Sequence, residues 1–227
     1  MTDRKEPIFG QVPALETFIA AADLVRRTKW LLLIFAAILV GLRVAGISSV
    51  GFETMFMGVL LMELMVRSGS RASVVTNGMR FRFLLGYLAM SLVVLALGAG
   101  LVLLPNMLFG ELSRGNIYLV SLLAAPLSLA AGLAVVGPWL VSQLRGKPCR
   151  ARRWVGSRFA ALLTAGWGFA FLSFLISAMS FTLARWVGSG TFLAPVLTGF
   201  LSTLGGLLFF PFAAVILDRA TQGPNEG

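Results

Sequence analysis

Four charged residues stand within or beside the first two long apolar stretches of this 227-residue chain: Arg43, Glu53, Glu63 and Arg67. A charge inside a membrane is costly and is kept for a reason, so these residues are the first candidates for chemistry. Arg43 and Glu53 flank a short turn and can pair across it, whereas Glu63 and Arg67 stand four apart on one helix. Two interpretations follow: structural ion pairs within the membrane, or a site for an ion or a substrate.

Residues for conventional catalysis are scarce, because the chain has no histidine and one cysteine, Cys149. Histidine is the usual ligand of haem and zinc and the usual base of hydrolytic triads, so those chemistries are excluded. A lone cysteine forms no internal disulfide, and we interpret Cys149 as a small loop residue. We predict no catalytic, metal-binding or cofactor-binding residue and no enzymatic activity.

The elements that position the four charges are predicted from hydropathy. The chain is 58% hydrophobic with a mean hydropathy of +0.89, beyond the range of a soluble domain. Six stretches are apolar enough for membrane-spanning helices, namely residues 30–47, 51–66, 83–104, 117–144, 159–184 and 192–217. The predicted fold class is an all-α integral membrane protein, with the six helices arranged as three antiparallel hairpins and short amphipathic interfacial helices on the cytoplasmic side.

The predicted domain organisation is a six-span membrane domain, residues 30–217, between a tail with an interfacial helix, residues 1–29, and a second cytoplasmic tail, residues 218–227. Apolar residues recur at helical spacing over residues 13–27, which predicts a helix on the membrane surface. The alternative is a cytoplasmic extension of the first span.

Prolines and one serine mark predicted helix ends. Pro105 is expected to end the third span, while Pro126 and Pro138 are expected to tilt or kink the fourth. Ser70 is expected to cap a brief surface helix before the third span. The sixth span contains Pro195 and Pro211, and a helix broken at such prolines can line a substrate path.

The distribution of cations predicts the orientation. Sixteen of the nineteen lysines and arginines lie in the terminal regions and in two inner connections, and three lie on the opposite side: Arg43, Arg114 and Arg185. By the positive-inside rule both termini are cytoplasmic. The predicted localisation is the bacterial inner membrane, as a multi-pass protein.

The segment from Arg145 to Arg158 contains six cations and no acidic residue. Cations that border apolar stretches favour contact with anionic lipid headgroups over nucleic acid, so we predict membrane lipids as partners and no nucleic acid. The candidate lipid contacts are Arg145, Lys147, Arg150, Arg152, Arg153 and Arg158.

Two parts of the chain resemble each other at a constant offset of 78 residues. Five residues match between them, pairing Gly78, Arg80, Phe81, Leu84 and Leu85 with Gly156, Arg158, Phe159, Leu162 and Leu163. The predicted unit is a short interfacial helix that ends in arginine, followed by two spans.

The run from Gly137 to Arg158 ends a span at a proline and leads through a turn to an arginine-bearing surface helix, with its key residues at Pro138, Gly146, Arg153, Ser157 and Arg158. This arrangement resembles the six-span membrane domain of bacterial glycerophosphodiester phosphodiesterases, which also occurs in free-standing form. The resemblance implies a membrane scaffold. The family's activity belongs to a separate soluble domain without a counterpart here, so no catalytic residue is implied.

The predicted function is that of a non-enzymatic accessory subunit, or an assembly or scaffolding factor, of a larger membrane complex, with a membrane-protein partner or a second copy of the chain. Small residues at spacing four support close helix contacts, as in Ala124, Ser128 and Gly132 and again in Thr198, Ser202 and Gly206. The alternative is a small transporter or lipid-handling protein. A cavity reaching Glu53 or Glu63 would favour that alternative.

Overall fold

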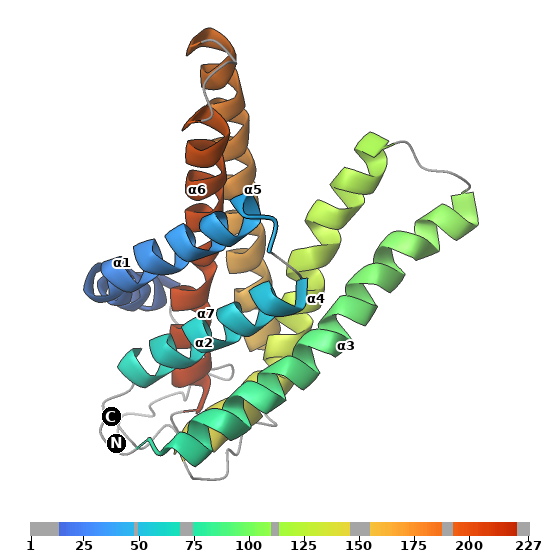
Figure 1. Ribbon diagram of the computed structural model, residues 1–227. Helices are drawn as coiled ribbons and strands as arrows, with labels where there is room; N and C mark the ends of the chain where they lie inside the picture. The colour runs from blue at the N-terminus through green and yellow to red at the C-terminus, as the bar shows by residue number, and fades with distance from the viewer. Residues whose placement is uncertain are drawn as a thin grey trace, which may run out of the picture.

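The computed structural model describes residues 14–47, 50–68, 75–109, 114–145, 155–187 and 193–221. These residues form helices and no strand. The helices are α1 (Ala14–Val44), α2 (Val50–Ser68), α3 (Asn77–Phe109), α4 (Arg114–Arg145), α5 (Val155–Val187), α6 (Leu193–Leu207) and α7 (Phe209–Thr221). Figure 1 shows α3 and α4 as one arm that diverges from the arm of α5 and α6, with α1 and α2 crossing in front of α7.

Within the described ranges, four helical segments are long and apolar enough to cross a membrane: Asn77–Leu101, Ala124–Leu144, Phe159–Ile176 and Val196–Arg219. The last of them includes most of α6 and α7. The chain is therefore an all-helical, multi-pass membrane protein. Neither α1 nor α2 is among these four, and α2 carries three charges, Glu53, Glu63 and Arg67, within 19 residues.

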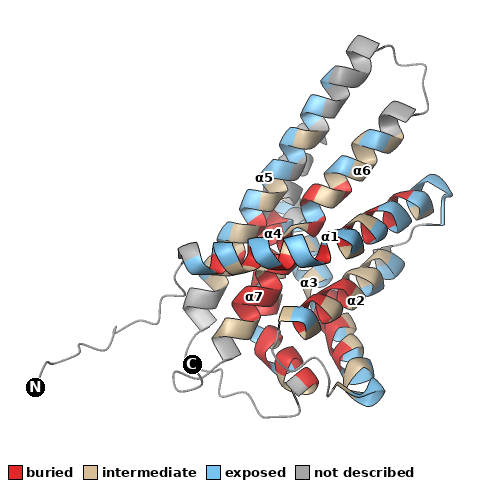
Figure 2. Cartoon of the chain, turned by 90° about the vertical axis from the view of Figure 1, so that its left-hand side faces the viewer, coloured by how far each residue is buried: buried red, intermediate tan, exposed pale blue. Residues whose placement is uncertain are grey.

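Several helix ends differ from those predicted. α1 is continuous across the expected boundary at Trp30, and both views show it changing direction along its length (Figures 1 and 2). Pro105, predicted to end the third span, does not end the helix, because α3 continues to Phe109. A proline so near a helix end removes one backbone hydrogen bond and leaves the next turn to form. The cap predicted at Ser70 lies outside the described residues.

The sixth predicted span is interrupted at Leu208 between α6 and α7, three residues before Pro211. Pro211 lies in the first turn of α7, where a residue without an amide proton is tolerated because that proton has no partner inside the helix. The candidate span from Val196 to Arg219 is thus two helices separated by Leu208 near its middle, where the Leu208 amide donates to the carbonyl oxygen of Leu204 at 3.2 Å.

The core is centred on α7, which packs against α1, α2, α4 and α5. Nearly every residue from Phe209 to Leu217 is buried, and α7 is red along most of its length in Figure 2. At the contact with α4, a Cβ on Gly137 would stand 2.4 Å from a methyl carbon of the buried Leu217. A side chain at position 137 would have to displace the buried side chain of Leu217.

The repeat is visible in the helices, since α3 and α5 both contain 33 residues and the bounds of α5 are those of α3 displaced by 78 positions. Each packs against the helix that follows it, α3 against α4 and α5 against α6. In contrast, α1 packs mainly against α6 and α7, and α2 mainly against α7 and α3. The first two helices therefore fill a different position from the two arms.

The first turn of α1 lies beside the last turn of α7. Arg219 donates from Nη2 to the carbonyl oxygen of Glu16 at 3.1 Å and from Nη1 to Oγ1 of Thr17 at 3.4 Å, and it lies 3.6 Å from the Glu16 carboxylate. The outer ends of the first and last described helices are on the same side of the bundle.

Candidate functional site

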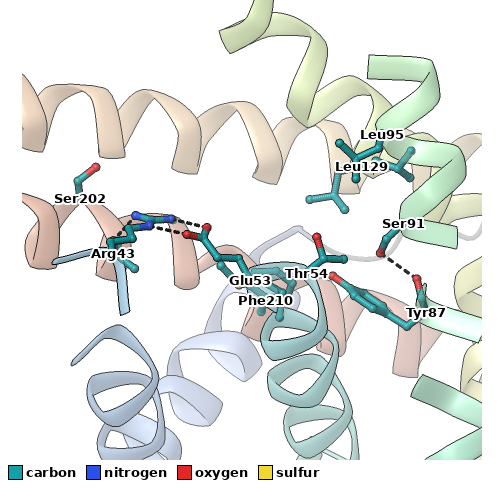
Figure 3. A pocket seen from close by; sticks show the side chains of 13 residues that line it. Arg43, Glu53, Thr54, Tyr87, Ser91, Leu95, Leu129, Ser202 and Phe210 are labelled. Carbon is teal, nitrogen blue, oxygen red and sulfur yellow. Dashed lines mark hydrogen bonds and ion pairs between the residues drawn. The ribbon is translucent and has the colours of Figure 1, made fainter. Parts of the chain in front are cut away.

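A cavity of about 510 Å³ lies where α1, α2, α3, α4 and the α6–α7 break meet. We call it the Arg43–Glu53 cavity. Its lining residues are Arg43, Glu53, Thr54, Met57, Tyr87, Ser91, Val94, Leu95, Leu129, Ser202, Thr203, Gly206 and Phe210, which Figure 3 draws as sticks. The volume is in the range of small-molecule sites in proteins.

The end of α1 positions Arg43. The amide of Ile47 donates to the carbonyl oxygen of Leu42 at 3.0 Å, and the amide of Gly46 donates to the carbonyl oxygen of Arg43 at 3.1 Å. These are the two hydrogen bonds of a Schellman motif. Gly46 has a φ of 70°, which favours glycine because a side chain would crowd the backbone. This cap stops the helix so that Arg43 lies in its last turn, where a cation is favoured by the helix dipole.

Glu53 lies in the first turn of α2, where a carboxylate is favoured for the same reason. Its two oxygens accept from Arg43, Oε1 from Nε at 2.8 Å and Oε2 from Nη2 at 2.7 Å, in a bidentate pair. The third guanidinium nitrogen, Nη1, donates to Oγ1 of Thr203 on α6 at 3.0 Å. The pair connects three helices, and exposed fractions of 45% for Arg43 and 24% for Glu53 show that the cavity opens to the surface.

Tyr87 forms the opposite wall. A Cβ on Gly58 of α2 would stand 2.5 Å from the Tyr87 ring, so the glycine allows the ring to lie against α2. The side chain is 4% exposed, and Figure 3 shows its hydroxyl end directed toward Thr54 and the cavity. One turn along α3, Ser91 donates from Oγ to the carbonyl oxygen of Tyr87 at 2.8 Å.

The α6–α7 break supplies the third wall. Thr203 and Gly206 precede it and Phe210 follows it, and all three line the cavity. Interrupted membrane helices place backbone polar groups at mid-membrane depth and line substrate sites in many transporters. The break therefore lies beside the cavity, between lining residues Gly206 and Phe210.

A second ion pair lies outside the cavity. Arg80 of α3 donates from Nη1 to Oε1 of Glu63 at 3.1 Å, so the structure pairs Glu63 with Arg80 and not with Arg67. Arg67 is exposed in the last turn of α2, whereas the first turn of α3 brings Arg80 across to Glu63. The Nε of Arg80 is buried and makes no hydrogen bond to the described part of the chain.

The predicted lipid contacts lie mostly beyond the described ranges. Arg145 is the last residue of α4 and Arg158 lies in the first turn of α5. The other four, Lys147, Arg150, Arg152 and Arg153, are outside the described residues.

The cavity is suited to binding more than to bond making. Its described lining carries one cation and one carboxylate, held together, and five hydroxyl groups from Thr54, Tyr87, Ser91, Ser202 and Thr203. In the described part of the chain no three His, Cys, Asp or Glu side chains are placed to hold a metal ion. Sequence reasoning missed the hydroxyl lining, and it assigned Ser202 and Gly206 to helix packing. Small residues spaced four apart on a helix fit both close helix packing and the lining of a cavity.

No family model, curated protein or solved structure matches the chain. Its function is therefore argued from the site alone.

Proposed function

We propose that the chain is a lipid-handling membrane protein or small transporter that binds an amphiphilic molecule in the Arg43–Glu53 cavity. The observation that carries this proposal is the cavity itself, which reaches Glu53 and lies beside an interrupted helix. Of the two predicted functions, an accessory subunit needs no such space, whereas a lipid-handling protein or transporter does.

The proposed topology is six crossings, with α1 and α2 completing the four long apolar segments and both termini in the cytoplasm of a bacterium. The contact of Arg219 with Glu16 supports an even number of crossings, because it brings the outer ends of the first and last helices to one side. A six-span architecture also fits the resemblance to the membrane domain of glycerophosphodiester phosphodiesterases.

The test is purification of the full chain in mild detergent, followed by native mass spectrometry and by transport assays in liposomes. We expect a monodisperse protein that retains a small amphiphile, and we expect Glu53→Gln to reduce this retention. Glu16→Gln is the matched control, because Glu16 is an exposed carboxylate outside the cavity. Equal retention by wild type and Glu53→Gln would contradict the proposal.

A second candidate, an accessory subunit or assembly factor, is favoured by the apolar surface of the two arms. Large hydrophobic residues are exposed on α3 and α5, among them Leu92, Val93, Leu97, Phe171, Leu175 and Met179. Such surfaces meet lipid or another membrane protein. In the same purification, a membrane protein that co-purifies in a stoichiometric amount, together with a cavity that holds no ligand, would favour this function.

A further inference from the structure

We infer that the Arg43–Glu53 cavity selects an uncharged, hydroxyl-bearing lipid headgroup and excludes charged ones. This inference rests on the proposed function and adds the chemical class of the ligand.

The first argument is charge balance. The Glu53 carboxylate takes two guanidinium nitrogens of Arg43, and Thr203 takes the third. No other charged side chain is among the described residues that line the cavity. A headgroup with a net charge would find no free counter-charge among these residues, and to gain one it would have to break the bidentate pair.

The second argument is the hydrogen-bonding capacity of the lining. Thr203 accepts from Arg43 and still has a hydroxyl proton to donate, while Ser91 donates to Tyr87 and still has lone pairs to accept with. A ligand that uses both must offer one donor and one acceptor, and by the charge balance above it does so without a net charge. A hydroxyl group does this, as in the glycerol end of a neutral glycerolipid.

The third argument is the apolar end of the cavity. Val94, Leu95 and Leu129 complete the lining on the side of the α3–α4 arm, and Leu95 is 46% exposed. A hydrocarbon chain that leaves the cavity there continues along the exposed Leu92 and Val93 surface of α3. A water-soluble polyol would leave these apolar side chains without a partner, so the ligand is a lipid rather than a free sugar or glycerol.

The experiment uses the full chain in nanodiscs of phosphatidylethanolamine and phosphatidylglycerol. Three photoreactive probes share one acyl chain and differ in the headgroup: a monoacylglycerol (uncharged), a lysophosphatidylcholine (zwitterionic) and a lysophosphatidylglycerol (anionic). Mass spectrometry measures labelling of the α3 segment between Tyr87 and Leu95. We expect the monoacylglycerol to label this segment about tenfold more than either other probe, a factor that corresponds to a modest difference in binding free energy.

A cavity-filling variant, Ser91→Leu, should lose this labelling, and Leu129→Phe provides a second filling variant if the first fails to fold. Thr164→Leu is the matched control, because Thr164 also bonds to the carbonyl four residues before it, at 2.8 Å, but is exposed on α5 outside the cavity. It should label as wild type does. Labelling that persists in both filling variants would overturn the assignment of the site.

The remaining outcomes separate the two proposals. Stronger labelling by either phosphate-bearing probe would overturn the headgroup inference while leaving ligand binding in the cavity intact. Displacement of the monoacylglycerol by free glycerol would show that the cavity does not recognise the acyl chain of the probe. This result would overturn the assignment of the ligand as a lipid. Absence of labelling by all three probes would remove the proposed function together with the inference.

Discussion

Replacing Glu53 alone should destabilise the protein more than replacing Glu53 and Arg43 together. In Glu53→Leu the Arg43 guanidinium loses two of its three hydrogen bonds and keeps the one to Thr203. Removing one partner of a fully buried pair costs about 3–5 kcal/mol, and an exposed pair contributes about 1 kcal/mol or less. With exposed fractions of 45% and 24%, the expected loss in the free energy of unfolding is about 2 kcal/mol, between these limits.

The double variant, Arg43→Leu with Glu53→Leu, leaves neither charge unpaired and should lie within about 1 kcal/mol of wild type. The free energy of unfolding is measured by titration with dodecyl sulfate in mixed micelles, followed by far-ultraviolet circular dichroism. Asp23→Ala is the control, because the Asp23–Arg27 pair in α1 is a well-exposed i,i+4 contact at 2.6 Å and should contribute at most about 0.5 kcal/mol.

Additive losses in the double variant would refute the reasoning. The two single changes would then act independently, and the bidentate pair would not be the link among α1, α2 and α6 that its geometry indicates.

Other substitutions test the packing, the second ion pair and the topology. Gly137→Ala should lower the free energy of unfolding by about 1–3 kcal/mol, because its Cβ would overlap a buried leucine, whereas Gly168→Ala meets open space and should be neutral or stabilising in the same titration. Glu63→Gln should lower the free energy of unfolding by about 1 kcal/mol, because it leaves Arg80 without a carboxylate partner. Arg67→Gln should change the free energy of unfolding little, and equal effects of the two substitutions would contradict the pairing of Glu63 with Arg80. A cysteine introduced at position 188 in place of Gly188 should react with an impermeant thiol reagent from outside intact cells, and a requirement for permeabilised cells would reverse the proposed orientation.

Hydropathy alone was enough to predict the membrane class and the approximate positions of the helices in both arms. The apolar stretches are long, and the local sequence decides whether such a stretch is helical in lipid. The repeat signal also identified α3 and α5, whose equal lengths follow from the matching residues around Arg80 and Arg158.

Features set by tertiary contacts were harder to predict. The residues flanking Leu208 continue the apolar pattern of the span, so hydropathy does not locate the break, although Pro211 indicated that the span could be broken. Glu63 has an arginine four residues away on its own helix, and the structure gives it Arg80 of α3 instead. A pattern of spacing describes one helix at a time and says little about which neighbour will be closest.

The hydroxyl lining was missed for a related reason. Ser91 and Tyr87 stand singly in apolar stretches, and Thr203 follows Ser202, without a motif that connects the three. Arg43 and Glu53, by contrast, were recognisable candidates because charges are rare in such stretches. The structure adds which uncharged groups face the same space.

The central position of α7 has a consequence for how the protein is made. Of the seven described helices it is synthesised last, yet α1, α2, α4 and α5 all pack against it. Until residues from Phe209 onward have been synthesised, the faces of α2 and α4 that they cover have only lipid or the insertion machinery as neighbours. Insertion and core formation are thus separated in time, because the faces that α7 covers remain accessible to membrane chaperones and proteases until α7 has been inserted.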